Sequence, residues 1–254
     1  MSLATAGLLL LAALTGSMPV FLLRSRGRPR DPDVARRPTT VMLGARVRDW
    51  AVWVLGPVER GLVRSGITPD ALNFLGAAAG LAAGVAFATS ALGLAAWLLA
   101  LGGISDILDG RVARARGITT RYGAFLDSTL DRFSETGTFV GVAWYFTGSP
   151  GMTAATVLAI SGSLLVSYTR ARGEALGVPF AGGLMQRAER VVLLMLGALL
   201  DAAVSRRMEW LPGTLLSGAV VLIAFGTVAT AIHRAVAIAR RLAKADAADG
   251  GTGV

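Results

Sequence analysis

Apolar residues are gathered along the chain into seven long runs, which short polar and mostly basic segments separate. The first run covers residues 3–23, and the others lie at about 71–89, 91–112, 122–147, 152–172, 188–205 and 213–236. A membrane-spanning α-helix needs about 20 predominantly apolar residues, and these runs have about that length. The pattern predicts an all-α polytopic membrane protein with six core transmembrane helices, preceded by one extra N-terminal span.

A different pattern fills residues 42–66, where tryptophans and aliphatic residues alternate with arginines. Trp50 and Trp53 share this segment with Arg48 and Arg60, which makes it too charged to cross a bilayer. We expect an amphipathic helix that lies in the membrane interface, bent or divided at Pro57.

The chain therefore divides into an N-terminal transmembrane segment (1–23), a basic cytoplasmic linker (24–41), the interfacial helix (42–66), a core domain (67–242) and a tail (243–254). The tail is rich in Ala, Gly and Asp, and we expect it to be disordered. A secretory signal would carry its positive charge before the first apolar run, whereas here the basic residues follow it. We expect an uncleaved span with its N-terminus outside, and a cleaved or peripheral segment is the alternative.

Composition agrees with a membrane protein, because 54% of the residues are hydrophobic and the mean hydropathy is +0.60. An excess of 25 Lys and Arg over 16 Asp and Glu would also suit a nucleic-acid-binding protein. However, aromatic residues are few and the basic residues cluster between the apolar runs, so we expect no nucleic-acid partner. The lack of cysteine excludes disulfides, thiolate metal sites and cysteine nucleophiles.

The basic residues also predict the orientation. If the run at 71–89 enters from the cytoplasm, 22 of the 25 Lys and Arg lie on the cytoplasmic side, as the positive-inside rule requires. We therefore expect a multi-pass protein of the cell (inner) membrane whose acidic motif, described next, faces the cytoplasm.

The most informative stretch is DILDGRVARARGITTRYGAFLDSTLD, residues 106–131, which places four aspartates in mostly apolar surroundings. Asp106 and Asp109 are three residues apart and Asp127 and Asp131 four apart, so each pair projects from one face of a helix. Two facing helix ends bring all four carboxylates together, and such a group needs cations to offset its repulsion. All-oxygen ligation suits Mg²⁺ or Mn²⁺, which makes a phosphate-bearing substrate the natural partner.

One alternative interpretation bears on these acids. Intramembrane carboxylates also occur in transporters, so an acid-lined transporter is a function of a different class. A transporter has no need of Gly110 and Gly123 at this spacing, where the lack of a Cβ lets a ligand or a helix approach closely. Nearby, Arg132 and Glu135 stand one turn apart at membrane depth and are expected to pair with each other.

The stretch fits the pattern Asp-x2-Asp-Gly-x2-Ala-Arg-x8-Gly-x3-Asp-x3-Asp at all eight fixed positions, Asp106, Asp109, Gly110, Ala113, Arg114, Gly123, Asp127 and Asp131. It thereby resembles the CDP-alcohol phosphatidyltransferases, integral membrane enzymes that displace CMP from a CDP-lipid with an alcohol. The layout of apolar runs extends the resemblance from about residue 67 to 239. The resemblance implies a transferase domain over 67–242, CDP-diacylglycerol as donor, two Mg²⁺ or Mn²⁺ ions, contact with membrane lipids and a homodimer.

The resemblance also implies a role for each matching residue. Asp106, Asp109, Asp127 and Asp131 match metal ligands, and Asp131 also matches the general base. The positions matching those that hold the CDP-lipid or pack closely around it are Pro69, Asp70, Gly110, Ala113, Arg114, Thr120 and Gly123.

Arginines on the same predicted membrane face suit the acceptor, because guanidinium groups bind phosphate oxygens in pairs. The segments SYTRARGEALG, QRAERVVL and GAFLDSTLDRFSE resemble phosphatidylinositol-phosphate synthases, which implies inositol phosphate as acceptor and Arg170, Arg187 and Arg190 as its phosphate contacts. Arg170 stands where those enzymes usually carry Lys, so glycerol phosphate or another alcohol is the alternative acceptor. Arg172 fits a lipid-headgroup contact equally well.

Overall fold

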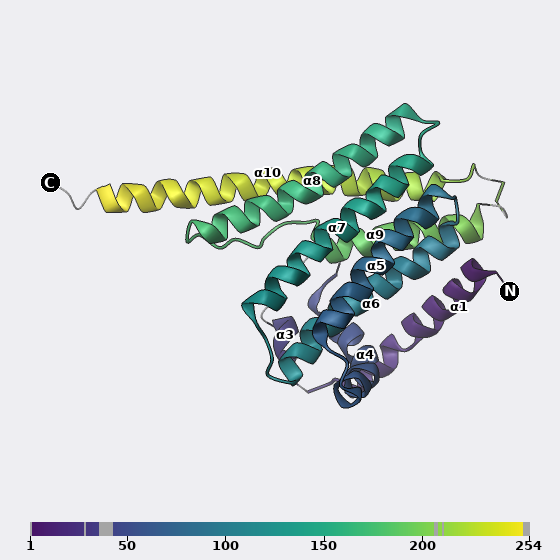
Figure 1. Cartoon of the computed structure of the whole chain (residues 1–254), viewed down its shortest axis with the longest axis horizontal. Helices are drawn as coiled ribbons and strands as arrows, with labels where there is room; N and C mark the ends of the chain where they lie inside the picture. Colours follow the sequence, from purple (N-terminus) through teal and green to yellow (C-terminus); the bar gives the residue numbers. More distant parts are fainter. Residues whose placement is uncertain (1, 28, 36–42, 206–207, 210, 251–254) are drawn as a thin grey trace.

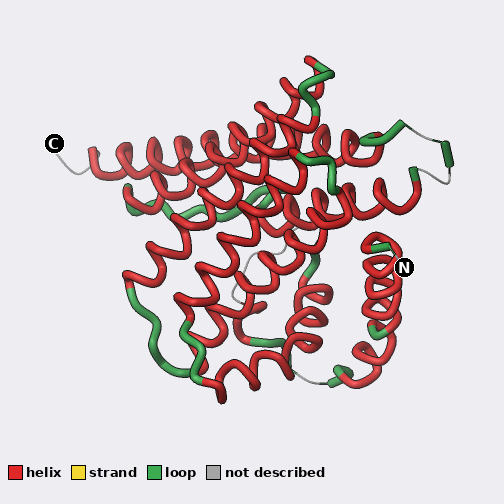
Figure 2. Tube along the Cα trace, turned by 45° about the vertical axis from the view of Figure 1, so that its right-hand side comes forward, coloured by secondary structure: helices red, strands yellow, loops and turns green. Residues whose placement is uncertain are grey.

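The computed structural model describes residues 2–27, 29–35, 43–205, 208–209 and 211–250. Every regular element within these ranges is a helix, and Figure 2 shows the helices joined by mostly short loops. They are α1 (Leu3–Gly16), α2 (Met18–Arg24), α3 (Pro32–Ala35), α4 (Ala45–Ser65), α5 (Pro69–Ala88), α6 (Leu92–Ala115), α7 (Arg121–Tyr145), α8 (Pro150–Ala175), α9 (Arg187–Val204) and α10 (Thr214–Gly250). The all-α prediction is confirmed.

Helices α5 to α10 form in the apolar runs from 71–89 onward, and α4 forms in the expected interfacial segment. Pro57 lies inside α4 without dividing it. Among the described residues, five stretches are long and apolar enough to cross a membrane: Leu3–Arg24, Pro69–Ala88, Leu92–Ala115, Pro150–Ala175 and Thr214–Ala247. Helices α7 and α9 are not among them, since each carries several charged side chains, and those side chains build the site described below.

Side-chain caps fix where three helices of the core begin. The Thr68 hydroxyl accepts the N–H of Ala71 at 3.2 Å, and Pro69 fills the first turn of α5. The Thr120 hydroxyl accepts the N–H of Gly123 at 3.0 Å and starts α7. At the start of α9, Gln186 and Glu189 form a reciprocal capping box.

Glycines let α5 lie directly against α7. A Cβ on Gly84 would collide with the backbone of Gly137, and a Cβ on Gly141 would collide with the backbone of Gly84. One turn nearer the aspartates, a Cβ on Gly80 would collide with the side chain of Ser134. This close approach is what the small residues of the 71–89 run predict, and it sets the position of α7 relative to the rest of the bundle.

Replacing Gly84 by leucine should therefore lower the melting temperature of the purified protein. The leucine has to displace the α7 backbone, and overpacking of this kind costs about 1–3 kcal/mol or more. Gly218→Leu is the matched control, because a Cβ there meets nothing within 4 Å. Equal melting temperatures for the two variants would contradict this view of the α5–α7 contact.

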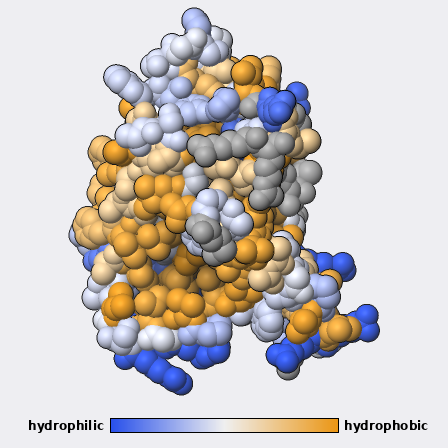
Figure 3. Space-filling model, turned by 90° about the vertical axis from the view of Figure 1, so that its right-hand side faces the viewer, coloured by the Kyte–Doolittle hydropathy of each residue, from blue (hydrophilic) through white to orange (hydrophobic). Residues whose placement is uncertain are grey.

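The apolar core fills the half of the bundle opposite the aspartates. Its fully buried members include Phe87, Val142, Ala159, Leu216 and Ile223, which come from four different helices. Figure 1 shows α8 and α10 running beside each other and α1 at the edge of the bundle, where it contacts α6 and α9. On the face shown in Figure 3, hydrophobic residues cover the middle and hydrophilic residues gather at the two ends, as expected where lipid surrounds a protein.

The prediction of a disordered tail is wrong for residues 243–250, because α10 continues to Gly250. Ala, Arg and Lys, which dominate the segment after Ala239, are strong helix formers and extend the helix beyond its apolar part. Residues 251–254 lie outside the described residues. Within the predicted linker, the helix α2 continues to Arg24 and α3 forms one short turn.

Candidate metal and phosphate site

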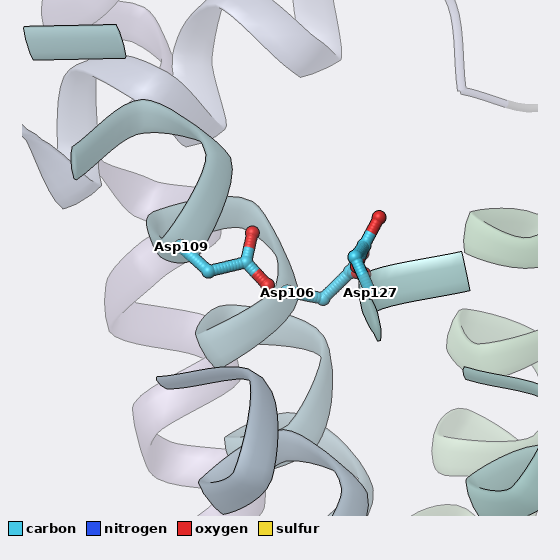
Figure 4. Close-up of side chains that lie close together, drawn as sticks. All are labelled: Asp106, Asp109 and Asp127. Atoms are coloured by element: carbon cyan, nitrogen blue, oxygen red, sulfur yellow. The ribbon is translucent and has the colours of Figure 1, made fainter. Parts of the chain in front are cut away.

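Three of the four motif aspartates come together between α6 and α7. Asp106 and Asp109 lie near the end of α6, Asp127 lies near the start of α7, and one carboxylate oxygen from each is within 4.8 Å of the others. Figure 4 shows these side chains grouped between the two helices. Helical spacing places Asp106 and Asp109 on one face of α6, and the following loop reverses the chain so that Asp127 of α7 meets them, as the sequence predicted.

A buried amide from a third helix holds two of these acids. The Asn73 side chain of α5 faces both acids; with its amide oriented so that nitrogen points to the carboxylates, which satisfies all three groups, it donates to Asp127 Oδ1 at 3.2 Å and to Asp109 Oδ2 at 2.5 Å. The backbone N–H of Gly110 also donates to the Asp109 carboxylate. Asn73 was not identified from the sequence, although an amide within an Ala- and Gly-rich apolar run is a signal that it has a polar partner.

The fourth acid, Asp131, is connected to the group through Arg187. Arg187 Nη1 lies 2.5 Å from Asp106 Oδ1, and its Nη2 lies 2.8 Å from Asp131 Oδ1. One guanidinium at the first position of α9 thus bridges acids from α6 and α7. Arg187 was predicted to bind the acceptor phosphate, whereas the structure places it on the aspartates themselves.

Arg190, one turn further along α9, is paired with Glu135 of α7. Its Nε and Nη2 lie 2.5 Å and 2.9 Å from the two Glu135 oxygens, and the Arg190 side chain is only 3% exposed. The expected pairing of Arg132 with Glu135 is wrong, because Arg132 donates to the Ser128 carbonyl instead. A fork that reaches both carboxylate oxygens from a facing helix is stronger than a single contact along one helix.

The third predicted acceptor contact, Arg170, lies at the end of α8 and is 54% exposed. Its Nε donates to Glu174 Oε1 at 2.8 Å, one turn along the same helix. Arg172 is exposed as well.

Arg234 of α10 is a buried arginine to which the sequence analysis assigned no role. It donates to the carbonyls of Val166, Ala181 and Gly182 and so fixes the loop that leads into α9.

The residues predicted to contact the CDP-lipid lie around the ends of α5, α6 and α7. Pro69 and Asp70 open α5, and the exposed Arg114 lies in the last turn of α6 close to Gly110. Thr120 and Gly123 have a local function as the cap of α7, while Ala113 is half-buried on α6. These positions border the aspartates, and their contact with a nucleotide stays a prediction.

The charges of the site fit hard divalent cations. Four carboxylates, from Asp106, Asp109, Asp127 and Asp131, face one guanidinium, from Arg187, so the group is strongly negative. Carboxylate oxygens a few ångströms apart are the ligands that Mg²⁺ and Mn²⁺ prefer. Asp106, Asp109 and Asp127 have the spacing to share an ion, and Asp131 stands beside them.

Comparison with known proteins identifies the family. Residues 66–230 match the model of the CDP-alcohol phosphatidyltransferase domain, which covers most of the predicted 67–242 domain. A protein of Streptomyces avermitilis named phosphatidylinositol phosphate synthase is 37% identical over 233 residues, covering 88% of this chain and 92% of that protein. One of Mycobacteroides abscessus with the same name is 38% identical over 165 residues, covering 62% of this chain and 74% of that protein.

Solved structures of the Mycobacterium tuberculosis phosphatidylinositol phosphate synthase have a similar fold. The form with CDP-DAG bound gives a TM-score of 0.64 at 33% identity and covers 72% of this chain and 92% of that one. The form in complex with manganese and citrate gives the same TM-score and identity and covers 72% and 87%. The eight motif positions, the helical fold and these matches lead to one conclusion: the chain is a membrane protein and belongs to the CDP-alcohol phosphatidyltransferase family.

Proposed function

We propose that this protein transfers a phosphatidyl group from CDP-diacylglycerol to inositol phosphate, releasing CMP, with Mg²⁺ or Mn²⁺ as cofactor. The observation that carries the proposal is the convergence of Asp106, Asp109 and Asp127 within the family motif. Relatives at 37% and 38% identity are named for this activity, and the solved relative binds CDP-DAG in one structure and manganese in another.

The aspartates would hold the metal ions, and with them the diphosphate of the donor. When bound, divalent ions would supply positive charge to offset that of the diphosphate and of the leaving CMP. Asn73 and the Gly110 N–H keep Asp109 in place, and Asn73 also orients Asp127. The acids are thus held by three helices before the donor arrives, so little reorganisation is needed on binding.

Asp131 accepts the proton of the attacking hydroxyl. The hydroxyl oxygen of the acceptor bonds to the phosphorus that carries the diacylglycerol, and the bond from that phosphorus to the CMP oxygen breaks. Arg187 holds Asp131 Oδ1 at 2.8 Å, which orients the carboxylate and favours its charged form. We therefore assign Arg187 to orienting the acids, in place of the acceptor-phosphate role predicted from the sequence.

Arg170 and Arg190 remain the proposed contacts of the acceptor phosphate. Arg170 is exposed at the end of α8, and Glu174, to which its Nε donates, is also exposed. Arg190 is held by Glu135, so an acceptor phosphate that uses Arg190 has to compete with that carboxylate. Arg190 lies at the end of the bundle that carries the aspartates, since it is one turn from Arg187, which contacts Asp106.

A CMP-release assay tests the function. Purified protein with CDP-diacylglycerol and Mg²⁺ is supplied with inositol phosphate, glycerol phosphate, free inositol or no acceptor, and the lipid products are analysed by mass spectrometry. We expect acceptor-dependent CMP release and a phosphatidylinositol-phosphate product. A product with glycerol phosphate alone would establish the alternative acceptor, and CMP release without a new lipid would reduce the activity to hydrolysis. The acid-lined transporter has no support from the family to which the chain belongs.

We also propose that the site faces the cytoplasm, as the distribution of basic residues suggests. Because the chain has no cysteine, single introduced cysteines report orientation without background. Thr119→Cys, in the loop before α7, should be protected from a membrane-impermeant maleimide in intact cells, whereas Thr147→Cys, in the loop after α7, should be labelled. The reverse labelling pattern would contradict the proposed orientation.

We further propose that the protein is a homodimer in the inner membrane, which rests on the family resemblance. Light scattering in detergent, corrected for bound detergent, should give about twice the monomer mass of 26.2 kDa. A mass of one chain at all concentrations would contradict the dimer.

A further inference from the structure

Arg111, the residue that follows Gly110 in the motif, forms ion pairs with two acids from the segment that precedes the family domain. Arg111 Nε lies 2.6 Å from Glu59 Oε2 of α4, and its Nη1 lies 3.2 Å from Asp31 Oδ2, just before α3. The matched domain begins at residue 66, so both acids lie outside it. All three side chains are largely buried, with exposures of 14% for Arg111, 17% for Glu59 and 22% for Asp31.

A second contact fixes α4 to the same end of α6. Arg116 donates to the carbonyls of Leu62 and Val63 in the last turns of α4 and to the carbonyl of Ile67, at 2.8 to 2.9 Å. Arg111 and Arg116 are therefore held against α4 at two successive levels of α6. Figure 1 shows α3 and α4 together at the end of the bundle where α6 ends and α7 begins.

The same helix also reaches α9. Arg48, near the start of α4, lies 3.7 Å from Glu189, whose side chain is fully buried and caps α9 beside Arg187. Helix α4 thus contacts both α6, which carries Asp106 and Asp109, and α9, which carries the arginine that bridges the acids. An interfacial helix does not need ion pairs with two core helices, such as Glu59 with Arg111 and Arg48 with Glu189, in order to lie on a membrane.

We infer that Asp31 and Glu59 are positioning residues of the metal site. By holding Arg111 they fix the turn of α6 that contains Asp109 and Gly110, and so set the distance of Asp109 from Asp127 on α7. The inference rests on the proposed metal-dependent transfer. It extends the functional unit of this chain to include the segment before residue 66.

The effect of each substitution on cation affinity distinguishes a positioning role from an effect of charge alone. Neutralising Glu59 or Asp31 removes negative charge near the site, which by itself weakens cation binding. Neutralising Arg111 removes positive charge, which by itself strengthens cation binding, whereas loss of positioning weakens it. Arg111→Gln is therefore the decisive variant, and the pair exchange Glu59→Arg with Arg111→Glu restores an ion pair at unchanged net charge.

The experiment measures the Mn²⁺ concentration that gives half of the maximal Mn²⁺-induced rise in melting temperature, for the full chain in detergent. We expect this concentration to rise about tenfold in Asp31→Asn/Glu59→Gln and in Arg111→Gln, within the range for groups that support metal ligands, and to return toward wild type in the pair exchange. Arg60→Gln, an exposed neutralisation on α4, is the control and should leave it unchanged.

The melting temperature without added metal reports folding separately. Variants that melt lower but keep the wild-type half-saturating Mn²⁺ concentration would overturn the inference. The contact of Arg111 with Asp31 and Glu59 would then contribute to stability alone. An increased Mn²⁺ affinity in Arg111→Gln would overturn it in favour of charge. If the wild-type protein showed neither Mn²⁺-dependent stabilisation nor CMP release, the proposed function itself would fail, which is a result distinct from both.

Discussion

Asp131→Asn is expected to lower the turnover of CMP release by about 10²- to 10⁴-fold, the range for loss of a general base. An amide cannot accept the proton of the acceptor hydroxyl at neutral pH. The substitution keeps the shape of the side chain, and Arg187 Nη2, 2.8 Å from Asp131 Oδ1, can donate to the amide oxygen as it does to the carboxylate. Stabilisation of the protein by CDP-diacylglycerol and Mn²⁺ should therefore persist, as linkage requires for a ligand that still binds.

Asp127→Asn is the matched comparison, because it changes the same atoms in the acid group that converges within 4.8 Å. This variant should lose both turnover and the Mn²⁺-dependent rise in melting temperature. Together the two variants separate holding the metal from accepting the proton. Wild-type turnover in Asp131→Asn would place the base elsewhere, and loss of Mn²⁺ stabilisation in that variant would make Asp131 chiefly a ligand.

The convergence of the acids was predictable because it depends on local geometry. Asp106 and Asp109 fall on one face of a helix at any position in a fold, and the short loop between α6 and α7 forces the second pair to face them. The starts of the helices were predictable for the same reason, since Thr68 and Pro69 act within one turn of chain. Sequence spacing therefore identified both the chemistry and the part of the fold that carries it.

Contacts between helices distant in sequence could not be predicted in this way. Asn73 reaches Asp109 and Asp127 because glycines allow α5 to lie close to α7. The sequence shows the small residues, but it does not show which side chains their contact brings together. The spacing of Arg132 and Glu135 indicated a pair, but the rotation of α9 brings Arg190 onto Glu135 with two hydrogen bonds. For the same reason, the position of Arg187 on the predicted membrane face did not reveal that its guanidinium contacts Asp106 and Asp131.

Removing the guanidinium of Arg190 should raise the KM for inositol phosphate. Loss of a hydrogen bond between charged groups costs about 1.5–3 kcal/mol, which corresponds to roughly ten- to a hundredfold in KM. Arg190→Ala also leaves Glu135 without its partner in a buried position, so its melting temperature has to be measured alongside. The KM for CDP-diacylglycerol should change little, and free inositol, which has no phosphate, should be affected much less.

Glu135→Gln tests the same contact from the opposite side. In the structure both Glu135 oxygens engage Arg190, so the acceptor phosphate competes with a carboxylate for one guanidinium. A neutral amide competes less well, and the KM for inositol phosphate should therefore fall in Glu135→Gln while it rises in Arg190→Ala. Opposite shifts in the two variants, with unchanged KM for free inositol in Glu135→Gln, would assign Arg190 to the acceptor phosphate. If both variants lost stability but kept the wild-type KM for every phosphorylated acceptor, the pair would serve only to join α7 to α9, and Arg170 alone would remain as the proposed phosphate contact.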